Sequence, residues 1–523
     1  MRTYLAILPL VVIASVLLIS VPADSADGYE YFDDGVLEYE VIENDTVTVS
    51  KYLQDSGVTD VVVPSKVDYE GMTYTVTAVM YGTFSPEEVI SVTLPVTVEE
   101  LYAESFSGIN IQRIDVDPAN PHFTSIDGII YDYKLRELIR CPSGYQTKSV
   151  ETPESLASIG RAAFEKCTNI ESIKVNDGLI LIDMYAFYDC SSLSTVTVKG
   201  VVNELPETLA VISSFAFSHC KSLTDIYLPE QLTLIGESAF AQTGLKELTI
   251  PERVDHIGDS AFGGCTDLKK IESDNSKYIS EDGVLFQSGD QKKLFCYPAG
   301  REGAEYTIPN DVTTIAPDAF EECVNLKKVN LGELTTIPDS AFAQCRSLEE
   351  IDLSDISVIG ILSFIDCVNL KEVKFGDNLY VIGMMAFESS GIEEFTAPVS
   401  LTTIGSNAFS DCHNLKKVTF PEDSECYVDT YAFWRSTNLT EMYIGSNGVT
   451  LEDDALTIGT SVDKVTLNIT VPKGYTISET THNESTELNI TFIGERPYPY
   501  ENLIGIIICI LVLFAIFKLF RKV

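Results

Sequence analysis

The sequence has few basic residues, only five histidines and a single tryptophan. It contains 35 Lys and Arg against 78 Asp and Glu, which gives a formal net charge of −43 at pH 7. An acidic surface of this kind repels nucleic acid and anionic lipid, so we expect no nucleic-acid partner. Disorder is also excluded, because 45% of the residues are hydrophobic and 10% are aromatic.

The motifs of familiar enzyme and metal sites are absent as well. No Cys-x-x-Cys pair occurs, the histidines are scattered, and neither Gly-x-Ser-x-Gly nor His-Glu-x-x-His is present. The sequence also has no phosphate-binding glycine-rich loop and no Asp-x-Asp-x-Asp-Gly loop for Ca²⁺. We therefore expect no catalytic residue, no metal site and no cofactor, and we interpret the acidic residues as a solvated surface.

Both ends of the chain carry uncharged apolar runs. Arg2 precedes the first run, and small residues follow it, which predicts a secretory signal peptide at 1–26; a retained anchor is the alternative, because the run is somewhat long. Residues 502–520 are predicted to span a lipid bilayer as a helix. Basic residues follow, so the tail 521–523 is placed in the cytoplasm and the rest of the chain outside; a removable lipid-anchor signal is the alternative.

A repeat of 22 to 24 residues fills most of the chain. Each unit reads Leu-x-x-Ile-x-Leu-Pro, then Ile-Gly, then Ala-Phe-x-x-Cys. Two gaps of 58 residues between successive repeat phenylalanines indicate two inserts of equal size. The repeat phenylalanines are Phe106, Phe164, Phe187, Phe217, Phe240, Phe262, Phe320, Phe342, Phe364, Phe387, Phe409 and Phe433.

A single unit cannot bury its own apolar side, so the units must stack. The Leu-x-x-Ile-x-Leu segment has the period-two alternation of a short strand, which the proline ends. Strands stacked about 4.8 Å apart form a solenoid, with the Leu, Ile and Phe positions as internal columns. We expect about 16 coils in the range 58–445, a β cap at 27–57 and a β-rich cap or stalk at 446–496.

The repeat resembles the BspA-like leucine-rich-repeat surface proteins, over about 400 of the 523 residues. The two inserts, Ser125 to Tyr145 and Ser280 to Gly300, and the opening hairpin, Tyr69 to Val79, are similar to the same family. The resemblance implies a β-rich, α/β-type leucine-rich-repeat solenoid on a secreted or surface-anchored protein. Some members are implicated in adhesion to host or matrix proteins and to other cells. The predicted spanning C-terminus departs from members with other attachment signals, which leaves the type of cell envelope open.

Eight of the 12 cysteines share one position, three residues after the repeat phenylalanine. Other coils place Thr243, Ser390 or Ser436 there, so the position selects small volume and weak hydrogen bonding. We expect buried free thiols. Secretion and the short spacing between coils leave at least one disulfide along the column as the alternative. The eight are Cys167, Cys190, Cys220, Cys265, Cys323, Cys345, Cys367 and Cys412.

The residues between the buried positions of each strand must face outward and form parallel ladders, which we place on the concave face of the solenoid. This mixed, mildly aromatic face suits a protein or glycan better than a small molecule. The predicted binding residues are Asp225, Tyr227, Glu350, Asp352, Lys417, Thr419, Glu441 and Tyr443. Acceptor sequences for N-glycosylation begin at Asn44, Asn438, Asn468, Asn483 and Asn489.

These features favour a cell-surface, single-pass membrane protein that binds an extracellular protein or glycan, including partners on other cells, and has no catalytic activity. The alternative is a structural component of the cell envelope whose copies associate laterally. A third interpretation, an enzyme outside the cell, lacks a recognisable site.

Overall fold

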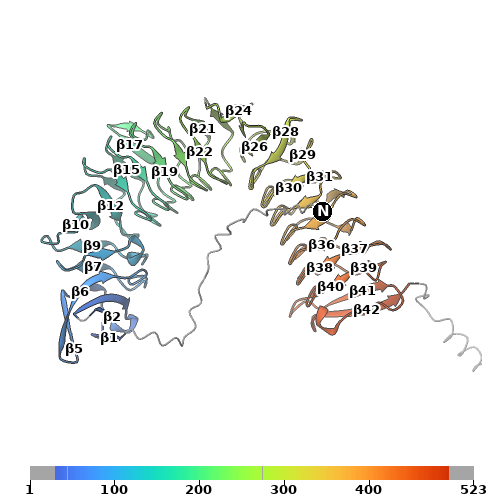
Figure 1. The fold of residues 1–523 in the computed structure, drawn as a ribbon, viewed down its shortest axis with the longest axis horizontal. Coiled ribbons are helices and arrows are strands. Elements are labelled where there is room, and N and C mark those ends of the chain that lie inside the picture. Colours follow the sequence, from blue (N-terminus) through green and yellow to red (C-terminus); the bar gives the residue numbers. More distant parts are fainter. Residues whose placement is uncertain (1–29, 44, 274, 494–523) are drawn as a thin grey trace, which may run out of the picture.

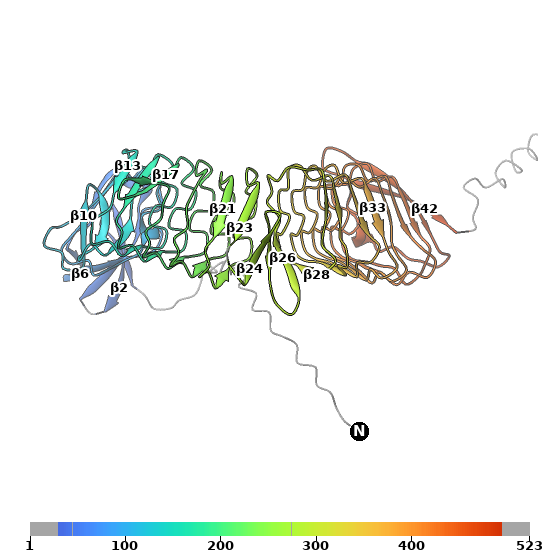
Figure 2. The same ribbon diagram turned by 90° about the horizontal axis from the view of Figure 1, so that it is seen from above.

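Stacked turns of chain build a long, curved body (Figures 1 and 2). The structure is a computed structural model, and it describes residues 30–43, 45–273 and 275–493. Within this part about 18 turns follow one another. A typical turn contains a strand of three or four residues, a second strand of two residues, and a tight return that carries the Ala-Phe pair.

The longer strands form the outer ladder of the solenoid. They are parallel and in register from turn to turn, except that the two-residue strand at 201–202 pairs antiparallel with the strand before it. Ile351, for example, pairs with Val373 and Asp352 with Lys374. In sheet order they are β4 (Asp60–Val62), β7 (Ser91–Leu94), β9 (Arg113–Val116); β13 (Ser149–Glu151), β15 (Ser172–Val175), β17 (Thr195–Val198), β18 (Val201–Val202); β21 (Glu247–Ile250), β23 (Lys270–Ser273); β27 (Glu305–Thr307), β29 (Lys328–Asn330), β31 (Glu350–Leu353), β33 (Glu372–Phe375); β35 (Glu394–Thr396), β37 (Lys417–Phe420), β39 (Glu441–Ile444), β41 (Val465–Val471) and β42 (Thr486–Phe492).

The shorter strands form the inner ladder, which the hairpins of the two inserts join. The first insert contributes β10 to β12 and the second β24 to β26. In sheet order the inner strands are β10 (Phe123–Ile126), β11 (Ile129–Asp132), β12 (Glu137–Arg140), β14 (Ser158–Ile159), β16 (Leu181–Ile182), β19 (Val211–Ile212), β20 (Leu234–Ile235), β22 (His256–Ile257); β24 (Tyr278–Glu281), β25 (Val284–Gln287), β26 (Lys292–Cys296), β28 (Val312–Ile315); β30 (Thr336–Ile337), β32 (Val358–Ile359), β34 (Val381–Ile382), β36 (Thr403–Ile404), β38 (Tyr427–Val428) and β40 (Thr450–Leu451).

A separate sheet covers the N-terminal end of the solenoid. Its strands are β1 (Tyr31–Asp33), β2 (Leu37–Glu43), β3 (Thr46–Tyr52), β6 (Met72–Val79) and β5 (Lys66–Tyr69), with β8 (Glu100–Leu101) beside β6. The helices in the described residues are three 3₁₀ turns, η1 (Gln54–Ser56), η2 (Ala103–Phe106) and η3 (Glu479–Thr481).

The predicted α/β type is therefore wrong: the described part of the chain is a β-solenoid with nearly no helix. The returns are not α-helical, because every second amide bonds to the next turn instead of to its own turn. The amides of Ser340, Phe342 and Gln344 donate to Ile361 O, Ser363 O and Ile365 O at 2.7 to 2.9 Å. Ser340 and Gln344 also have φ near +55°, which interrupts any α-helix.

The predicted count of about 16 coils is too low. After the repeat pattern ends, β41 and β42 still stack in parallel register on β39, so the ladder continues beyond the last recognisable repeat. Backbone pairing holds these strands together without the leucine and phenylalanine pattern of the other turns.

No helix within the described residues is long and apolar enough to cross a membrane, and the predicted spanning helix has no support from the structure. That segment, 502–520, lies outside the described residues, as do the predicted signal peptide at 1–26, the tail 521–523 and Asn44.

The outer ladder lies on the convex side of the arc, which corrects the expected concave position. In Figure 1, β19, β22, β36 and β38 lie toward the inside of the curve, and β17, β21, β37 and β39 toward the outside. The glycine that follows the inner strand lets neighbouring backbones crowd there. A Cβ atom on Gly405 would stand 2.6 Å from the Met384 nitrogen, closer than real contacts allow. The outer ladder, which has more room, breaks into more separate sheets.

The repeat phenylalanines line up inside the body, as predicted, and all twelve are buried. The ring of Phe342 stacks on Phe320 with a centroid distance of 4.8 Å and on Phe364 at 5.3 Å. Each ring is thus buried by contact with the rings of the neighbouring turns, so a turn has an apolar interior only when it is stacked between two others.

The cysteine position forms a second column, in which side chains bond to backbone. The Cys345 thiol donates to the carbonyl of Phe320, in the preceding turn, at 2.9 Å. The same bond recurs from Cys190, Cys220, Cys265, Cys367 and Cys412 at 2.9 to 3.2 Å, and from the Ser436 hydroxyl at 2.7 Å. The predicted selection for a small hydrogen-bonding side chain is confirmed. All eleven cysteines of the described residues are buried and free.

Replacing Phe342 with alanine should remove one ring from the column and leave a cavity between two turns. We expect a loss of about 3–5 kcal/mol in the free energy of unfolding, measured by urea denaturation followed by circular dichroism. The exposed Tyr133→Ala variant is the control, with an expected change within about 0.5 kcal/mol. Equal effects of the two substitutions would contradict the stacked interior.

Replacing Cys345 separates the volume of its side chain from its hydrogen bond. Cys345→Ser keeps a side-chain donor for the Phe320 carbonyl, whereas Cys345→Ala leaves that carbonyl with only the longer bond from the Cys323 amide, at 3.3 Å. We expect the alanine variant to be less stable than the serine variant by about 1–2 kcal/mol in the same urea experiment. If the Cys345→Ala variant were as stable as the Cys345→Ser variant, this position would require only a small side chain and not a hydrogen bond.

Candidate functional site

The predicted binding residues all lie on the outer ladder, but they do not form one site. Asp225 and Tyr227 precede β21, Glu350 and Asp352 lie on β31, and the last four lie on β37 and β39. In register, Lys417 stands beside Glu441 and Thr419 beside Tyr443. The structure therefore divides the eight residues into three groups along the convex face.

The first group lines a cavity of about 550 Å³ between two turns. Lys246 N donates to Thr224 O at 3.1 Å, but beyond this bond no hydrogen bond among the described residues joins 225–228 to β21. The segment is instead tied to the preceding turn, because Tyr227 N donates to Asn203 O at 2.8 Å. The backbones of the two turns are therefore not paired along this segment. Tyr227, which is 66% exposed, lines the cavity between them.

An additional strand causes this separation. The chain turns back after β17 into β18, which pairs with it antiparallel, and Glu204 then bridges to Tyr227. The extra residues explain why Phe187 and Phe217 are 30 positions apart in the sequence. Their insertion draws 225–228 toward β18 and away from β21.

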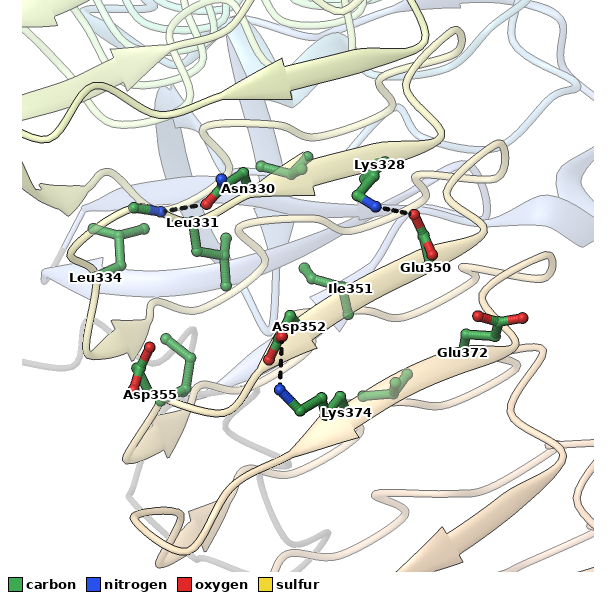
Figure 3. A pocket seen from close by; sticks show the side chains of 14 residues that line it. Lys328, Asn330, Leu331, Leu334, Glu350, Ile351, Asp352, Asp355, Glu372 and Lys374 are labelled. Atoms are coloured by element: carbon green, nitrogen blue, oxygen red, sulfur yellow. Dashed lines mark hydrogen bonds and ion pairs between the residues drawn. The ribbon is translucent and has the colours of Figure 1, made fainter.

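The second group lines a cavity of about 540 Å³ over β29, β31 and β33, shown in Figure 3. Glu350 pairs with Lys328 of the preceding strand, and Asp352 pairs with Lys374 of the next strand at 3.0 Å. Hydrogen bonds from Ser354 and then Lys374 hold the pKa of Asp352 below its usual value. Both predicted acids are thus members of a network of charged side chains that crosses three turns.

Sequence reasoning did not single out Lys374, Asp355 and Glu372, which line the same cavity. Lys374 occupies in β33 the outward position that Asp352 occupies in β31. Continuing the repeat register to the next turn would have identified it. Asp355 follows the strand in a turn whose direction the repeat does not encode.

The described residues of the outer ladder form no recognisable metal or thiol site. Among the described residues, no group of three or more His, Cys, Asp and Glu side chains could hold a metal ion. The thiols are poor nucleophiles, because burial raises the pKa of Cys265 to about 11 and that of Cys412 to about 12. Exposed charged pairs and aromatic rings in open hollows are features of recognition surfaces.

The repeat identified in this fold also matches a known family. Residues 68–147, 141–269, 202–289, 291–403 and 380–503 match the BspA type leucine rich repeat region (6 copies), which accounts for well over half of the chain. The chain belongs to the BspA-type leucine-rich-repeat family. None of the curated proteins matches it.

Solved structures similar to this BspA-type chain include three bacterial proteins. A leucine rich cell surface protein from Faecalibacterium prausnitzii is 23% identical, with 83% of this chain and 98% of that chain covered and a TM-score of 0.46. A leucine-rich repeat protein from Eubacterium ventriosum is 20% identical, with coverages of 81% and 95% and a TM-score of 0.47. The pneumococcal vaccine antigen PcpA is 17% identical, with coverages of 88% and 98% and a TM-score of 0.41. At these values the likenesses carry no argument about function.

The four described glycosylation acceptors of the BspA-type chain lie near its C-terminal end, and their use stays a prediction. Asn438, Asn468, Asn483 and Asn489 are all exposed. The Asn438 amide nitrogen donates to His413 O, and Asn369, at the same repeat position three turns earlier, donates in the same way to Arg346 O. A glycan on Asn438 would therefore replace a bond between turns.

One half-buried acid of the BspA-type solenoid lies outside the ladder, behind the second insert. Burial, and then the charges of Asp318 and Glu322, raise the pKa of Glu321 to about 8. The equivalent residue behind the first insert, Glu165, lies 4.0 Å from the guanidinium of the buried Arg140. At the second insert Cys296 takes the position of Arg140, so Glu321 has no cation beside it.

This difference predicts a pH dependence of stability. The unfolded Glu321 loses its proton near pH 4.5 and the folded one near pH 8, so the folded state holds the extra proton between these values and its stability falls as pH rises through that window. Glu321→Gln should have little effect at pH 4 and should stabilise by at least about 1 kcal/mol at pH 9, measured by urea denaturation. The matched variant Glu165→Gln, which loses its Arg140 contact, should not stabilise; equal gains in both variants would contradict the account.

Proposed function

We propose that this BspA-type protein is a recognition scaffold that binds an extracellular protein or glycan on its convex outer ladder and serves in adhesion. Family membership supports the setting, because BspA-like leucine-rich-repeat proteins are generally surface proteins. The observation that carries the proposal is the pair of open hollows on one face, each lined by outward-facing ladder residues.

The hollow at Asp225 and Tyr227 is the preferred anchor. Tyr227 presents a large exposed ring beside an acid on one wall, and Lys246 with Glu247 provides both charge signs on the other. Tyrosine is enriched among the residues that dominate binding energy, because it buries a large area and loses few rotamers. The hollow at Glu350 and Asp352 is more polar, since both acids are already paired with lysines.

Tyr227→Ala should weaken capture of the partner. The purified chain would be immobilised and exposed to host-matrix extract and to a glycan array, and bound species would be identified and titrated. We expect the alanine variant to bind the captured partner at least ten-fold more weakly, equivalent to about 1.4 kcal/mol. Tyr133→Ala, an equally exposed tyrosine on the first insert, is the matched control and should bind normally.

Two results would contradict this proposal. Partners that bind Tyr227→Ala, Asp352→Lys and Lys417→Glu variants as tightly as the native chain would show that the outer ladder is not the site. Capture of further copies of the same chain alone, with no foreign protein or glycan, would favour the structural role in the cell envelope.

A further inference from the structure

The outer ladder is interrupted at both inserts. β9 and β13 belong to different sheets, and so do β23 and β27. At each insert an antiparallel hairpin runs along the inner ladder in place of an outer strand, and Figure 2 shows β24 and β26 of the second one. The Asp-Gly turn of each hairpin covers the strand before the break: Ile114 N donates to Gly128 O at 3.0 Å, and Ile271 N to Gly283 O at 2.9 Å.

The strand after the first break, β13, keeps an open edge. Ser172 N donates to Lys148 O and Thr152 N to Lys174 O, so alternate residues of β13 face β15. The amides and carbonyls of Ser149 and Glu151 face the break instead, and they have no hydrogen-bond partner among the described residues. An exposed edge with free donors and acceptors at every second residue is a template for another strand.

A cavity of about 560 Å³ extends along this edge, and we call it the first notch. Its floor is apolar, because Ile129, Tyr131 and Tyr145 line it and are each at most 9% exposed. At its rim stands Asp127, whose carboxylate makes no hydrogen bond or ion pair within the described residues. The nearby Arg113 pairs with Asp115 instead.

The second insert has the same hairpin and Asp-Gly turn, but there an arginine pairs with the aspartate of the turn. Asp282 corresponds to Asp127 in the Asp-Gly turn, and Arg301 corresponds to Tyr145. The Arg301 guanidinium bonds to the Asp282 carboxylate at 2.5 Å and to the Asp282 carbonyl, and its carbon lies 5.9 Å from the Tyr297 ring centre. The cavity there includes Arg301 but no residue of β27. The second insert thus shows that a guanidinium group fits against the aspartate of this Asp-Gly turn.

We propose that the first notch accepts an extended strand from a partner protein, and that this strand carries an arginine or lysine beside an apolar residue. The partner backbone pairs with Ser149 and Glu151 along the edge of β13. Its apolar side chain covers Ile129, Tyr131 and Tyr145, and its cation takes the place beside Asp127 that Arg301 takes beside Asp282. The first notch shares no lining residue with the two outer-ladder hollows, so this proposal does not depend on the proposed function of those hollows.

Two variants and one modified ligand test the proposal. Random linear peptides displayed on phage would be selected on the immobilised full chain and then titrated as synthetic peptides. Tyr145→Arg places in the first notch the arginine that pairs with the aspartate at the second insert. This variant should bind the peptides at least ten-fold more weakly. Asp127→Asn keeps the left-handed turn, which asparagine tolerates, and should weaken binding of Arg- or Lys-containing peptides by about ten-fold. Methylating alternate peptide amides should abolish binding, because it removes the backbone pairing.

The control is the binding of the same peptides to Tyr133→Ala, which should equal that of the native chain. Peptides that bind Tyr145→Arg unchanged, or a selection without enrichment of basic residues, would overturn the proposal. If Tyr145→Arg does not fold, the Asp127→Asn and methylated-peptide titrations decide in its place. A dimer of this chain in sedimentation that Asp127→Asn dissociates would also overturn it, because the edge would then pair with a second copy.

Discussion

The structure depends on hydrogen bonds and ring stacking between successive turns at the Ala-Phe return. Amides of one return donate to carbonyls of the next, and the cysteine or serine three residues after the phenylalanine donates back to the preceding turn. The phenylalanine rings stack between these bonds. A return without its neighbours would leave several backbone groups unpaired and one ring exposed, so no turn is stable alone. The left-handed residues of each return persist because bonds on both sides hold them.

Two of the binding sites that we propose, the hollow at Tyr227 and the first notch, lie where the chain departs from the repeat. The regular turns satisfy their own backbone and leave only side chains outside. The additional strand β18 separates two turns beside Tyr227, and the first insert leaves β13 with an open edge. At the second insert an arginine of the chain itself, Arg301, pairs with the aspartate that corresponds to Asp127. At each insert the hairpin pairs with the inner strand that follows it, β12 with β14 and β26 with β28.

Much of this architecture could be predicted from the sequence, because its period and composition express the stacking directly. The phenylalanine column, the small hydrogen-bonding side chain at Cys345 and the outward direction of Asp352 follow from the repeat register. The direction of curvature does not, because it depends on how closely backbones approach at glycines such as Gly405. The α/β type and the coil count were wrong, since neither the returns nor β41 and β42 carry a pattern that specifies their pairing. The open edge of β13 exists because β9 and β13 do not pair, and no local sequence pattern predicts this.

Deleting one complete turn tests most directly whether the turns are interchangeable layers of one stack. Removal of residues 337–358 joins Thr336 to Ile359, which takes the strand position that Ile337 occupies one turn earlier, and brings Phe320 against Phe364. The measurement is the number of thiols that react with an alkylating reagent before and after denaturation. The account predicts that the shortened chain keeps its remaining thiols protected until it unfolds, whereas removal of half a turn, 337–347, exposes them. Reactive thiols after the whole-turn deletion, or protected thiols after the half-turn deletion, would contradict it.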